Sequence, residues 1–440
     1  MNKDKVRIVF LGGVGFVTKN MFVYEYWKND ELTDIVIIDC GIGFSEDGQE
    51  TIVPDVTYLK DKQKYLRGII LTHGHEDHTS ALHHLLEHVS APIYGTRLTL
   101  GLAKNKLNEH GKEGDFRIVK INTALTLGNF TIEFAHVTHS IPDATNILVK
   151  TPVGTLYHAS DFKFDWSPVD GWQSEVGKIA RWGEKGIMCL LSDCVRSERA
   201  GYTLSELTIR EGIDRQVRKA QGAVFFTTQS SNISRIQQAI EVANDYGRKI
   251  VLLGRSMRAN TEVAERLGYL KIPKKMVVDR RLAKKMPASK IMYIIAGSQA
   301  QEDSALYRLT EGTNKDVTIQ PNDTIVFSAD PIPGYEDQVH RLIDKLTLLG
   351  ANVAYSDIDD DLHVSGHGSQ YDLMLMMGLT RPKYIIPMGG EPRHVRQYAR
   401  LAYKMGYKEN QILQPFEKDA VEFTAAGEVK IVKEVAQSSQ

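Results

Sequence analysis

The sequence predicts an α/β fold with two units, and three observations support this class. Short apolar runs bounded by glycine and polar residues, typical of buried strands, occupy the first part of the chain. From about Thr203 onward, similar runs alternate with amphipathic helices, which is typical of βαβ units around a parallel sheet. A chain of 440 residues is also too long for one compact core. We therefore expect a second, α/β domain over roughly residues 205–355.

The first segment alternates between apolar strands and polar or glycine-containing turns. Strands are expected over residues 6–11, 34–39, 68–72, 130–137, 146–150 and 154–158. A helix is expected over residues 80–89, with Thr79 or Ser80 as its N-cap.

The later segments continue the pattern with longer helices. Helices are expected over residues 204–220, 234–246 and 261–267, and strands over 223–227, 250–253, 291–295 and 324–329. Beyond about residue 356, the sequence predicts a strand over 384–387 and an amphipathic helix after Pro392.

The composition is that of an ordinary globular enzyme. The net charge of −1 argues against a protein that holds nucleic acid by its overall charge, so a nucleic-acid partner would need a groove that concentrates basic side chains. No stretch approaches the roughly 20 apolar residues of a membrane span, and the first residues lead directly into a strand without a signal region. We therefore expect a cytoplasmic protein with no membrane contact.

Residues 73–78 read His-Gly-His-Glu-Asp-His and directly follow an apolar strand. A turn from strand to helix would point several of these imidazoles and carboxylates at one place. Such ligands suit zinc or manganese, and an open coordination position suits catalysis. The alternative is a polar loop that happens to be rich in histidine, which ordinary histidine usage makes a poor explanation. The motif therefore predicts a metal-dependent hydrolase.

Two later residues are candidates to complete the ligand set. His139 follows the strand expected over 130–137, and Asp161 follows the strand expected over 154–158. Active sites of such sheets collect polar side chains at strand ends. Either residue alone would be typical of a loop, but after the histidine motif both are expected to be ligands.

The His-x-His-x-Asp-His spacing, with His139 and Asp161, resembles the metallo-β-lactamase fold. Over essentially the whole chain, the sequence also resembles the ribonuclease J family of β-CASP nucleases. The matching segments are 12–15, 138–143, 201–203, 231–233, 235–238, 254–257, 297–299, 331–334 and 363–370. The resemblance implies a metallo-β-lactamase αββα sandwich, formed by residues 1–205 and 356–435, with a β-CASP α/β domain inserted over residues 206–355. It also implies that RNA lies in the cleft between the two.

The resemblance further implies two metal sites that share Asp161. One set would be His73, His75, His139 and Asp161, and the other Asp77, His78 and Asp161 with a C-terminal histidine. That histidine is missing, because a family segment that usually reads Pro-x-His-Gly-Glu is Pro-Met-Gly-Gly-Glu over residues 387–391 here. We expect one bound Zn²⁺ and a second site weakened by Gly389, with Mn²⁺ or Mg²⁺ as alternative ions.

Three residues are implied to carry out the chemistry, which would be metal-assisted hydrolysis of a phosphodiester. Asp77 would orient the attacking water or accept its proton. His367 would stabilise the transition state and protonate the leaving 3′ oxygen, and Asp193 would orient His367.

The resemblance also implies phosphate binding in several loops rich in small polar residues. The candidates are Ser231, Asn232, Ser298, Ser365, Gly366 and the loop 328–334. A site there for the 5′-terminal phosphate would favour a 5′-to-3′ exonuclease. The family pattern is not kept everywhere, since Ser234, Ala300-Gln301, Asp330, Phe16-Val17-Thr18 and Cys194-Val195-Arg196 replace its usual residues. The carboxylate of Asp330 would repel a nearby phosphate.

Three functions are compatible with these residues. The first is a metal-dependent ribonuclease that acts on single-stranded RNA as a 5′-to-3′ exonuclease, an endonuclease or both. The second, favoured by Gly389, is a catalytically weak RNA-binding subunit that pairs with an active paralogue. A small-molecule hydrolase ranks last because it gives the second domain no purpose. Both a homodimer and a hetero-oligomer are left open.

Overall fold

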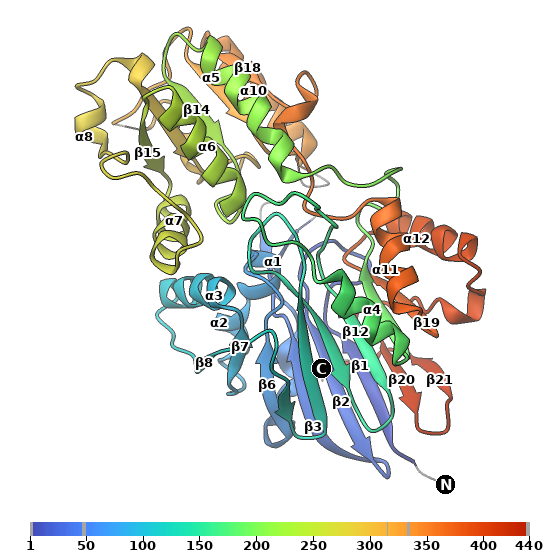
Figure 1. The fold of residues 1–440 in the computed structure, drawn as a ribbon. Helices are drawn as coiled ribbons and strands as arrows, with labels where there is room; N and C mark the ends of the chain where they lie inside the picture. Colours follow the sequence, from blue (N-terminus) through green and yellow to red (C-terminus); the bar gives the residue numbers. More distant parts are fainter. Residues whose placement is uncertain (1–2, 46–49, 315, 332–334, 437–440) are drawn as a thin grey trace.

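The computed structural model describes residues 3–45, 50–314, 316–331 and 335–436. Figure 1 shows two units, of which the upper one is formed by the middle of the chain. The lower unit contains both termini, so the chain leaves it once and returns to it.

Among the described residues, the first sheet of the lower unit has eight strands, in the order β21-β20-β1-β2-β3-β6-β7-β8. Their bounds are β1 (Lys5–Phe10), β2 (Phe22–Lys28), β3 (Glu31–Ile38), β6 (Leu66–Ile70), β7 (Ile93–Gly95), β8 (Phe116–Ile118), β20 (Ala420–Thr424) and β21 (Val429–Val432). The short strands β4 (Gly43–Phe44) and β5 (Thr51–Ile52) pair separately.

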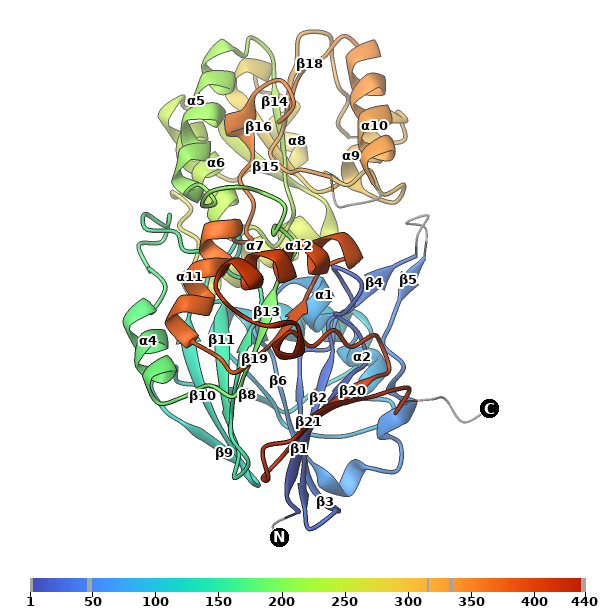
Figure 2. The ribbon, with the colours of Figure 1, turned by 90° about the vertical axis from the view of Figure 1, so that its right-hand side faces the viewer.

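The second sheet has six strands within the described part of the chain, in the order β19-β13-β12-β11-β10-β9. Their bounds are β9 (Leu125–Leu127), β10 (Phe130–His136), β11 (Thr145–Lys150), β12 (Thr155–Ala159), β13 (Cys189–Asp193) and β19 (Tyr384–Met388). The returning segment completes both sheets, because β19 lies parallel to β13 and β20 lies antiparallel to β1. Figure 2 shows this segment, in orange and red, beside strands from the first half of the chain.

The two sheets pack face to face, and helices cover both outer faces. The shared core is mainly apolar and includes Phe10 and Tyr24 from one sheet and Phe134 and Ile147 from the other. On the outer face of the first sheet lie α2 (Leu82–Leu85) and α3 (Arg97–Glu109). On the outer face of the second lie α4 (Val176–Glu184), α11 (Gln370–Thr380) and α12 (Pro392–Lys404). The lower unit is therefore an αββα sandwich.

The upper unit is built around a parallel sheet in the order β15-β16-β14-β17-β18. The bounds are β14 (Val224–Thr227), β15 (Lys249–Leu253), β16 (Ile291–Ile295), β17 (Thr324–Phe327) and β18 (Asn352–Ala354). One face packs on α5 (Ile209–Lys219), α6 (Ile233–Asp245) and α7 (Arg255–Leu267). The other packs on α8 (Arg280–Ala283), α9 (Ala305–Thr310) and α10 (Glu336–Leu348).

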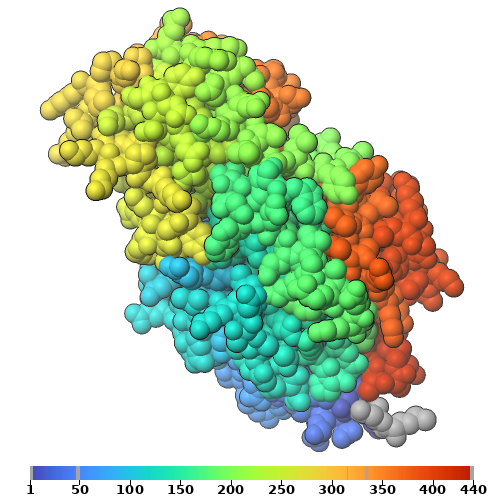
Figure 3. All heavy atoms as spheres, viewed as in Figure 1, coloured from blue at the N-terminus to red at the C-terminus, as the bar shows by residue number. Residues whose placement is uncertain are grey.

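The units meet through apolar packing, and the buried side chain of Arg235 holds α6 to the two connecting segments. Leu98 and Leu102 of α3 belong to the same buried cluster as Val263 of α7, and Figure 3 shows the yellow side chains of α7 resting on the blue ones of α3. Arg235 donates from Nε and Nη2 to the two carboxylate oxygens of Glu206, both at 2.8 Å. Because its guanidinium also donates to the carbonyl oxygen of Val364 at 2.8 Å, it ties α6 to both connecting segments.

The single helix expected over residues 80–89 is wrong. Within that range only Leu82–Leu85, α2, forms a helix, and a separate short helix, α1 (Glu76–Thr79), precedes it. The backbone between them is held by the end of β3, since the amide of Cys40 donates to the carbonyl of His78 at 2.8 Å and the amide of Ala81 to the carbonyl of Cys40 at 3.0 Å. These bonds compete with the next helical turn. Sequence periodicity also placed the start of α7 six residues too late and did not indicate α3. Within the residues described, no helix is long and apolar enough to cross a membrane.

Candidate metal centre

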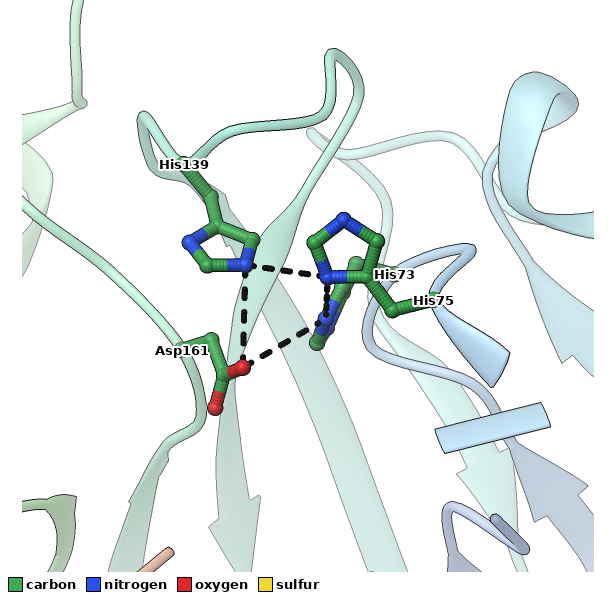
Figure 4. Close-up of side chains that lie close together, drawn as sticks. All are labelled: His73, His75, His139 and Asp161. Atoms are coloured by element: carbon green, nitrogen blue, oxygen red, sulfur yellow. Dashed lines mark hydrogen bonds and ion pairs between the residues drawn. The ribbon is translucent and has the colours of Figure 1, made fainter. Parts of the chain in front are cut away.

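His73, His75, His139 and Asp161 converge on one point at the top of the sandwich (Figure 4). Nδ1 of His75 lies 3.1 Å from Nε2 of His73 and 3.1 Å from Nε2 of His139. Oδ2 of Asp161 lies 3.7 Å from Nε2 of His73 and 3.6 Å from Nε2 of His139. Each residue thus offers one nitrogen or oxygen to a common centre, as a bound cation requires.

The local fold explains this convergence. The buried strand β6 ends at Ile70, and α1 begins at Glu76, so the histidine motif forms the turn between strand and helix. His139 and Asp161 follow β10 and β12, and a bridge between Thr138 and Lys163 holds their two loops together. All the predicted ligands therefore lie at one edge of the sandwich.

The ring nitrogens that face away from this point are already bonded. Nδ1 of His139 donates to the carbonyl of Gly366 at 2.8 Å, and Nδ1 of His73 contacts Oγ1 of Thr72 at 3.0 Å. These bonds leave Nε2 of both rings directed at the centre. Burial also lowers the pKa of His75 to about 3 and those of His73 and His139 well below the usual range, so the rings are neutral. Neutral imidazole is the form that coordinates a metal, so this set fits a cation.

A second set consists of Asp77, His78 and Asp161. Nε2 of His78 lies 3.6 Å from Oδ2 of Asp77 and 3.4 Å from Oδ2 of Asp161. Burial raises the pKa of Asp77 to about 6. Burial alone would lower the pKa of His78, but the carboxylates of Asp161, Asp77 and Asp39 raise it well above the usual range. The same Asp161 oxygen thus belongs to both sets.

Gly389 lies at the end of β19, with a left-handed backbone at φ +63°. A Cβ built there would have Asp193 Oδ1 as its nearest neighbour, at 3.6 Å, so a side chain would have room. The position lies directly beside the buried carboxylate of Asp193, at the same end of the sandwich.

His367 and Asp193 form a pair next to both sets. Nδ1 of His367 donates to Oδ2 of Asp193 at 2.7 Å, and Nε2 lies 3.8 Å from Oδ2 of Asp161. Burial alone would lower the pKa of His367, but the carboxylates of Asp193 and Asp161 raise it to about 9. The imidazole therefore holds a proton at neutral pH on a side chain that is 24% exposed.

Sequence reasoning missed three residues that support the predicted ligands. Asp39 accepts from His78 Nδ1 at 2.7 Å and from the hydroxyl of Thr72 at 2.8 Å. The side-chain amide of Asn20 contacts Nε2 of His78 at 3.0 Å. A signal existed only for Asp39, a carboxylate at the end of an apolar strand. Such partners orient ligands and raise their basicity.

The predicted phosphate-binding residues fall into two places. Ser365 and Gly366 lie at the centre, where Ser365 Oγ accepts from the amide of His367 at 3.1 Å. Ser231, Asn232 and Ser298 belong to the upper unit, at the ends of β14 and β16. The side chain of Asn232 caps α6 by accepting from the amide of Arg235 at 3.2 Å. Residues 332–334 of the predicted loop 328–334 lie outside the described residues.

Comparisons with known proteins match this architecture segment by segment. The metallo-beta-lactamase superfamily matches residues 14–176, the ribonuclease J beta-CASP domain matches 221–346, and a Zn-dependent metallo-hydrolase RNA specificity domain matches 352–413. A crystal structure of a protein of unknown function from Enterococcus faecalis has the same fold, with a TM-score of 0.67 at 14% identity, covering 97% of this chain and 100% of that one.

Curated relatives are similar over almost the whole chain. Ribonuclease J from Thermus thermophilus is 39% identical, over 92% of this chain and 71% of its own length. Ribonuclease J2 from Bacillus subtilis is 36% identical, over 96% of this chain and 76% of its own length. Ribonuclease J from Helicobacter pylori is 38% identical over 96% of this chain, which spans only 61% of that relative.

Fold and site together define a metallo-β-lactamase-fold protein with an inserted β-CASP domain, a class whose fold implies metal binding. Within this class, the chain belongs to the ribonuclease J family. The family resemblance and the fold class expected from the sequence are both confirmed.

Proposed function

We propose that this chain is a metal-dependent ribonuclease that hydrolyses phosphodiesters of single-stranded RNA. The observation that carries the proposal is the position of the His367–Asp193 pair, 3.8 Å from the carboxylate that both predicted ligand sets share. A proton donor therefore lies directly beside a place for a cation, and phosphodiester hydrolysis needs both. We further propose that the sandwich comprises residues 1–205 and 356–435 and that the β-CASP domain comprises residues 206–355. The strand order supports these limits.

A divalent cation in the first ligand set would supply an activated water and neutralise phosphate charge. Asp77 would orient that water or accept its proton. As the bond from phosphorus to the 3′ oxygen breaks, His367 donates its Nε2 proton to the leaving oxygen. Asp193 keeps the imidazole in place through Nδ1, at 2.7 Å. Ser365 and Gly366 hold the loop that carries His367 against His139.

Zinc is the ion that the first set fits best, since it combines three imidazoles with one carboxylate. Mn²⁺ and Mg²⁺ are the alternatives, Mg²⁺ being the weaker because it prefers oxygen ligands. The second set has two residues of its own and the shared Asp161, so its affinity for a cation is lower.

The change Gly389→His is expected to raise the bound metal from about one to about two ions per chain. An imidazole there would restore a ligand beside Asp193, and the space around the position is open. The left-handed backbone costs a non-glycine residue roughly 1–2 kcal/mol, which lowers the melting temperature slightly. Elemental analysis of the purified chain measures the effect. Gly389→Ala is the matched control, because it carries the same strain without a ligand, and a second ion in that variant would contradict the explanation.

A 5′-to-3′ exonuclease mode, alone or with endonuclease activity, is part of the proposal, and Asp330 weakens it. Its side chain is 46% exposed and lies 3.5 Å from Nε2 of His363. Its carbonyl accepts from Nε2 of Gln299 at 2.9 Å, which places it beside the loop of Ser298. A terminal phosphate bound by that loop would face an added negative charge.

The change Asp330→Ser is therefore expected to increase the preference for 5′-monophosphate over 5′-hydroxyl RNA. One charge repulsion removed at a half-exposed site is worth about 1 kcal/mol, or about fivefold in kcat/KM. The measurement compares two RNAs that differ only at the 5′ end. Asp344→Ser, on the exposed side of α10, is the control for net charge. An equal change in both variants would rule out a role for Asp330 in end recognition.

The ribonuclease proposal itself is tested by combining metal analysis with cleavage of 5′-monophosphate and 5′-triphosphate RNA of one sequence. The expected result is about one ion per chain and cleavage that Asp77→Asn abolishes. A chain without metal and without cleavage would refute it. Cleavage that ignores the 5′ end would refute only the exonuclease mode.

A second candidate is a catalytically weak RNA-binding subunit that pairs with an active paralogue. Gly389 favours this candidate, since a weakened second site lowers activity without removing the RNA surface. It predicts that purified chain binds RNA tightly but cleaves it slowly, and that mixing with an active paralogue gives a hetero-oligomer. Size-exclusion chromatography separates this outcome from the homodimer that an independent enzyme would form. For either candidate, we propose a cytoplasmic location.

A further inference from the structure

Arg196 carries a positive charge that has no carboxylate within ion-pair distance in the described part of the chain. It lies three residues beyond the end of β13 and is half-buried. Among the described residues, its guanidinium has one direct polar contact, a long one from Nε to the hydroxyl of Ser369 at 3.5 Å. Burying part of a charge without a partner costs free energy, so charged groups in such places are usually paired. The guanidinium thus has four more N–H donors available for a ligand.

The surroundings of Arg196 place it at the junction of the two units. Ser369 is the N-cap of α11 and follows His367 by two residues. Burial lowers the pKa of Arg196, and the neighbouring charges that act on it are Arg199, Asp330, Asp193 and Asp372. Of these, Asp330 belongs to the upper unit and Asp193 to the candidate catalytic pair. Arg196 is therefore near enough to both the His367–Asp193 pair and the upper unit to be influenced by their charges.

Two departures from the family pattern lie near Asp193, one at Gly389 and one three residues along the chain at Arg196. At Gly389, a ligand of the second cation is missing, and its empty side-chain position lies 3.6 Å from Asp193 Oδ1. At Arg196, a guanidinium replaces a residue of a segment that is usually small and polar. The change at Gly389 weakens the binding of a metal cation. The change at Arg196 adds a positive charge that is part of the protein, at the same end of the sandwich.

We propose that Arg196 binds a backbone phosphate of the RNA next to the phosphodiester that is cleaved, in part taking over the charge neutralisation of the weakened second cation. A guanidinium suits this task because its planar donors bind two phosphate oxygens at once. The inference rests on the proposed function, since it concerns the same RNA. Arg196 is a substrate-binding residue that distinguishes this chain from the family pattern.

RNA binding with cleavage suppressed tests the inference directly. Fluorescence anisotropy of a labelled single-stranded RNA is measured on the full chain carrying His367→Ala, which keeps all predicted metal ligands. Arg196→Ala, Arg196→Lys and Arg199→Ala are compared in this background across a salt series. Arg199 is the matched control because it is an exposed arginine on the same loop. Thermal unfolding confirms that each variant is folded.

The expected result is about tenfold weaker binding for Arg196→Ala, as for loss of a charge-assisted hydrogen-bond pair. The slope of log Kd against log salt should fall by about 0.7, since one phosphate contact to a single strand is lost. Arg196→Lys should recover part of the affinity, and Arg199→Ala should change it by less than about twofold.

Equal effects of Arg196→Ala and Arg199→Ala would overturn the inference, because the guanidinium would then only be solvated or attracted to Asp330. A chain that binds no RNA would overturn both this inference and the proposed function. A chain that binds RNA with the predicted loss at Arg196, while the wild type does not cleave it, would support the inference and overturn only the proposed activity.

Discussion

Replacing Asp161 with asparagine is expected to remove metal from both ligand sets and to lower RNA cleavage by about a thousandfold or more. One oxygen of Asp161 lies within 3.4 to 3.8 Å of the side-chain nitrogens of His78, His139, His73 and His367. The side-chain amide of asparagine is neutral. Its NH2 group is a hydrogen-bond donor, which would face the imidazoles in place of a ligand oxygen. A cation supplies several kcal/mol of transition-state stabilisation, and about 4 kcal/mol corresponds to a thousandfold in rate.

Metal per chain and kcat/KM on one RNA should fall together in this variant. Asp193→Asn is the matched control, because it changes the neighbouring buried carboxylate but leaves both ligand sets intact. It should retain the wild-type amount of metal. If Asp161→Asn keeps its metal and its rate, the shared-ligand arrangement is wrong and the catalytic centre lies elsewhere.

The predicted ligand sets could be found from sequence because most of their members are close in the chain or follow strand ends. His73 to His78 form one turn, and the loops of His139 and Asp161 follow strands of the same sheet. The parallel sheet of the middle segment was recognisable for a similar reason, since four of its strands are largely apolar runs between helices, whereas the short strand β18, which begins at Asn352, was not predicted. Local residue patterns and the layered geometry of such folds are enough to predict these features from the sequence.

The rest depends on contacts between distant segments. Asp193 and His367 are 174 residues apart, and only the insertion of the upper unit and the return of the chain bring them together. Residue patterns alone gave no reason to pair them, and the pairing came from the family resemblance. The supporting contacts of Asp39 and Asn20 have no sequence signal of comparable strength, because one aspartate or asparagine beside a strand is common. The break between α1 and α2 likewise comes from a backbone bond to Cys40, which no helical propensity predicts.

At Gly389 the sequence departs from the family pattern, and the structure shows which residues surround that position. In the sequence it is a missing ligand, and in the structure it is an open place beside Asp193 with Arg196 on the adjoining loop. The two observations give separate tests, one of metal content and one of RNA affinity. A chain that gains a second ion through Gly389→His should depend less on Arg196, so the two variants are expected to be non-additive.

Replacing His367 with alanine is expected to lower kcat by roughly 10²- to 10⁴-fold, the range for loss of a general acid, while metal content stays unchanged. The proton is held on this imidazole by Asp193 at 2.7 Å, so Asp193→Asn should have a smaller effect, about 10- to 100-fold. The double variant should be no worse than His367→Ala alone, since Asp193 acts through the histidine.

The leaving group distinguishes proton donation from a structural role of His367. A nitrophenyl phosphodiester releases an oxygen that needs no proton, so His367→Ala should lose far less activity on it than on RNA. Asp161→Asn should be equally impaired on both substrates, because the ion serves the attacking water and the phosphate in each. If His367→Ala is impaired to the same extent on both substrates, the histidine positions the phosphate but does not protonate the 3′ oxygen. The ratio of the two losses therefore measures the proton transfer itself.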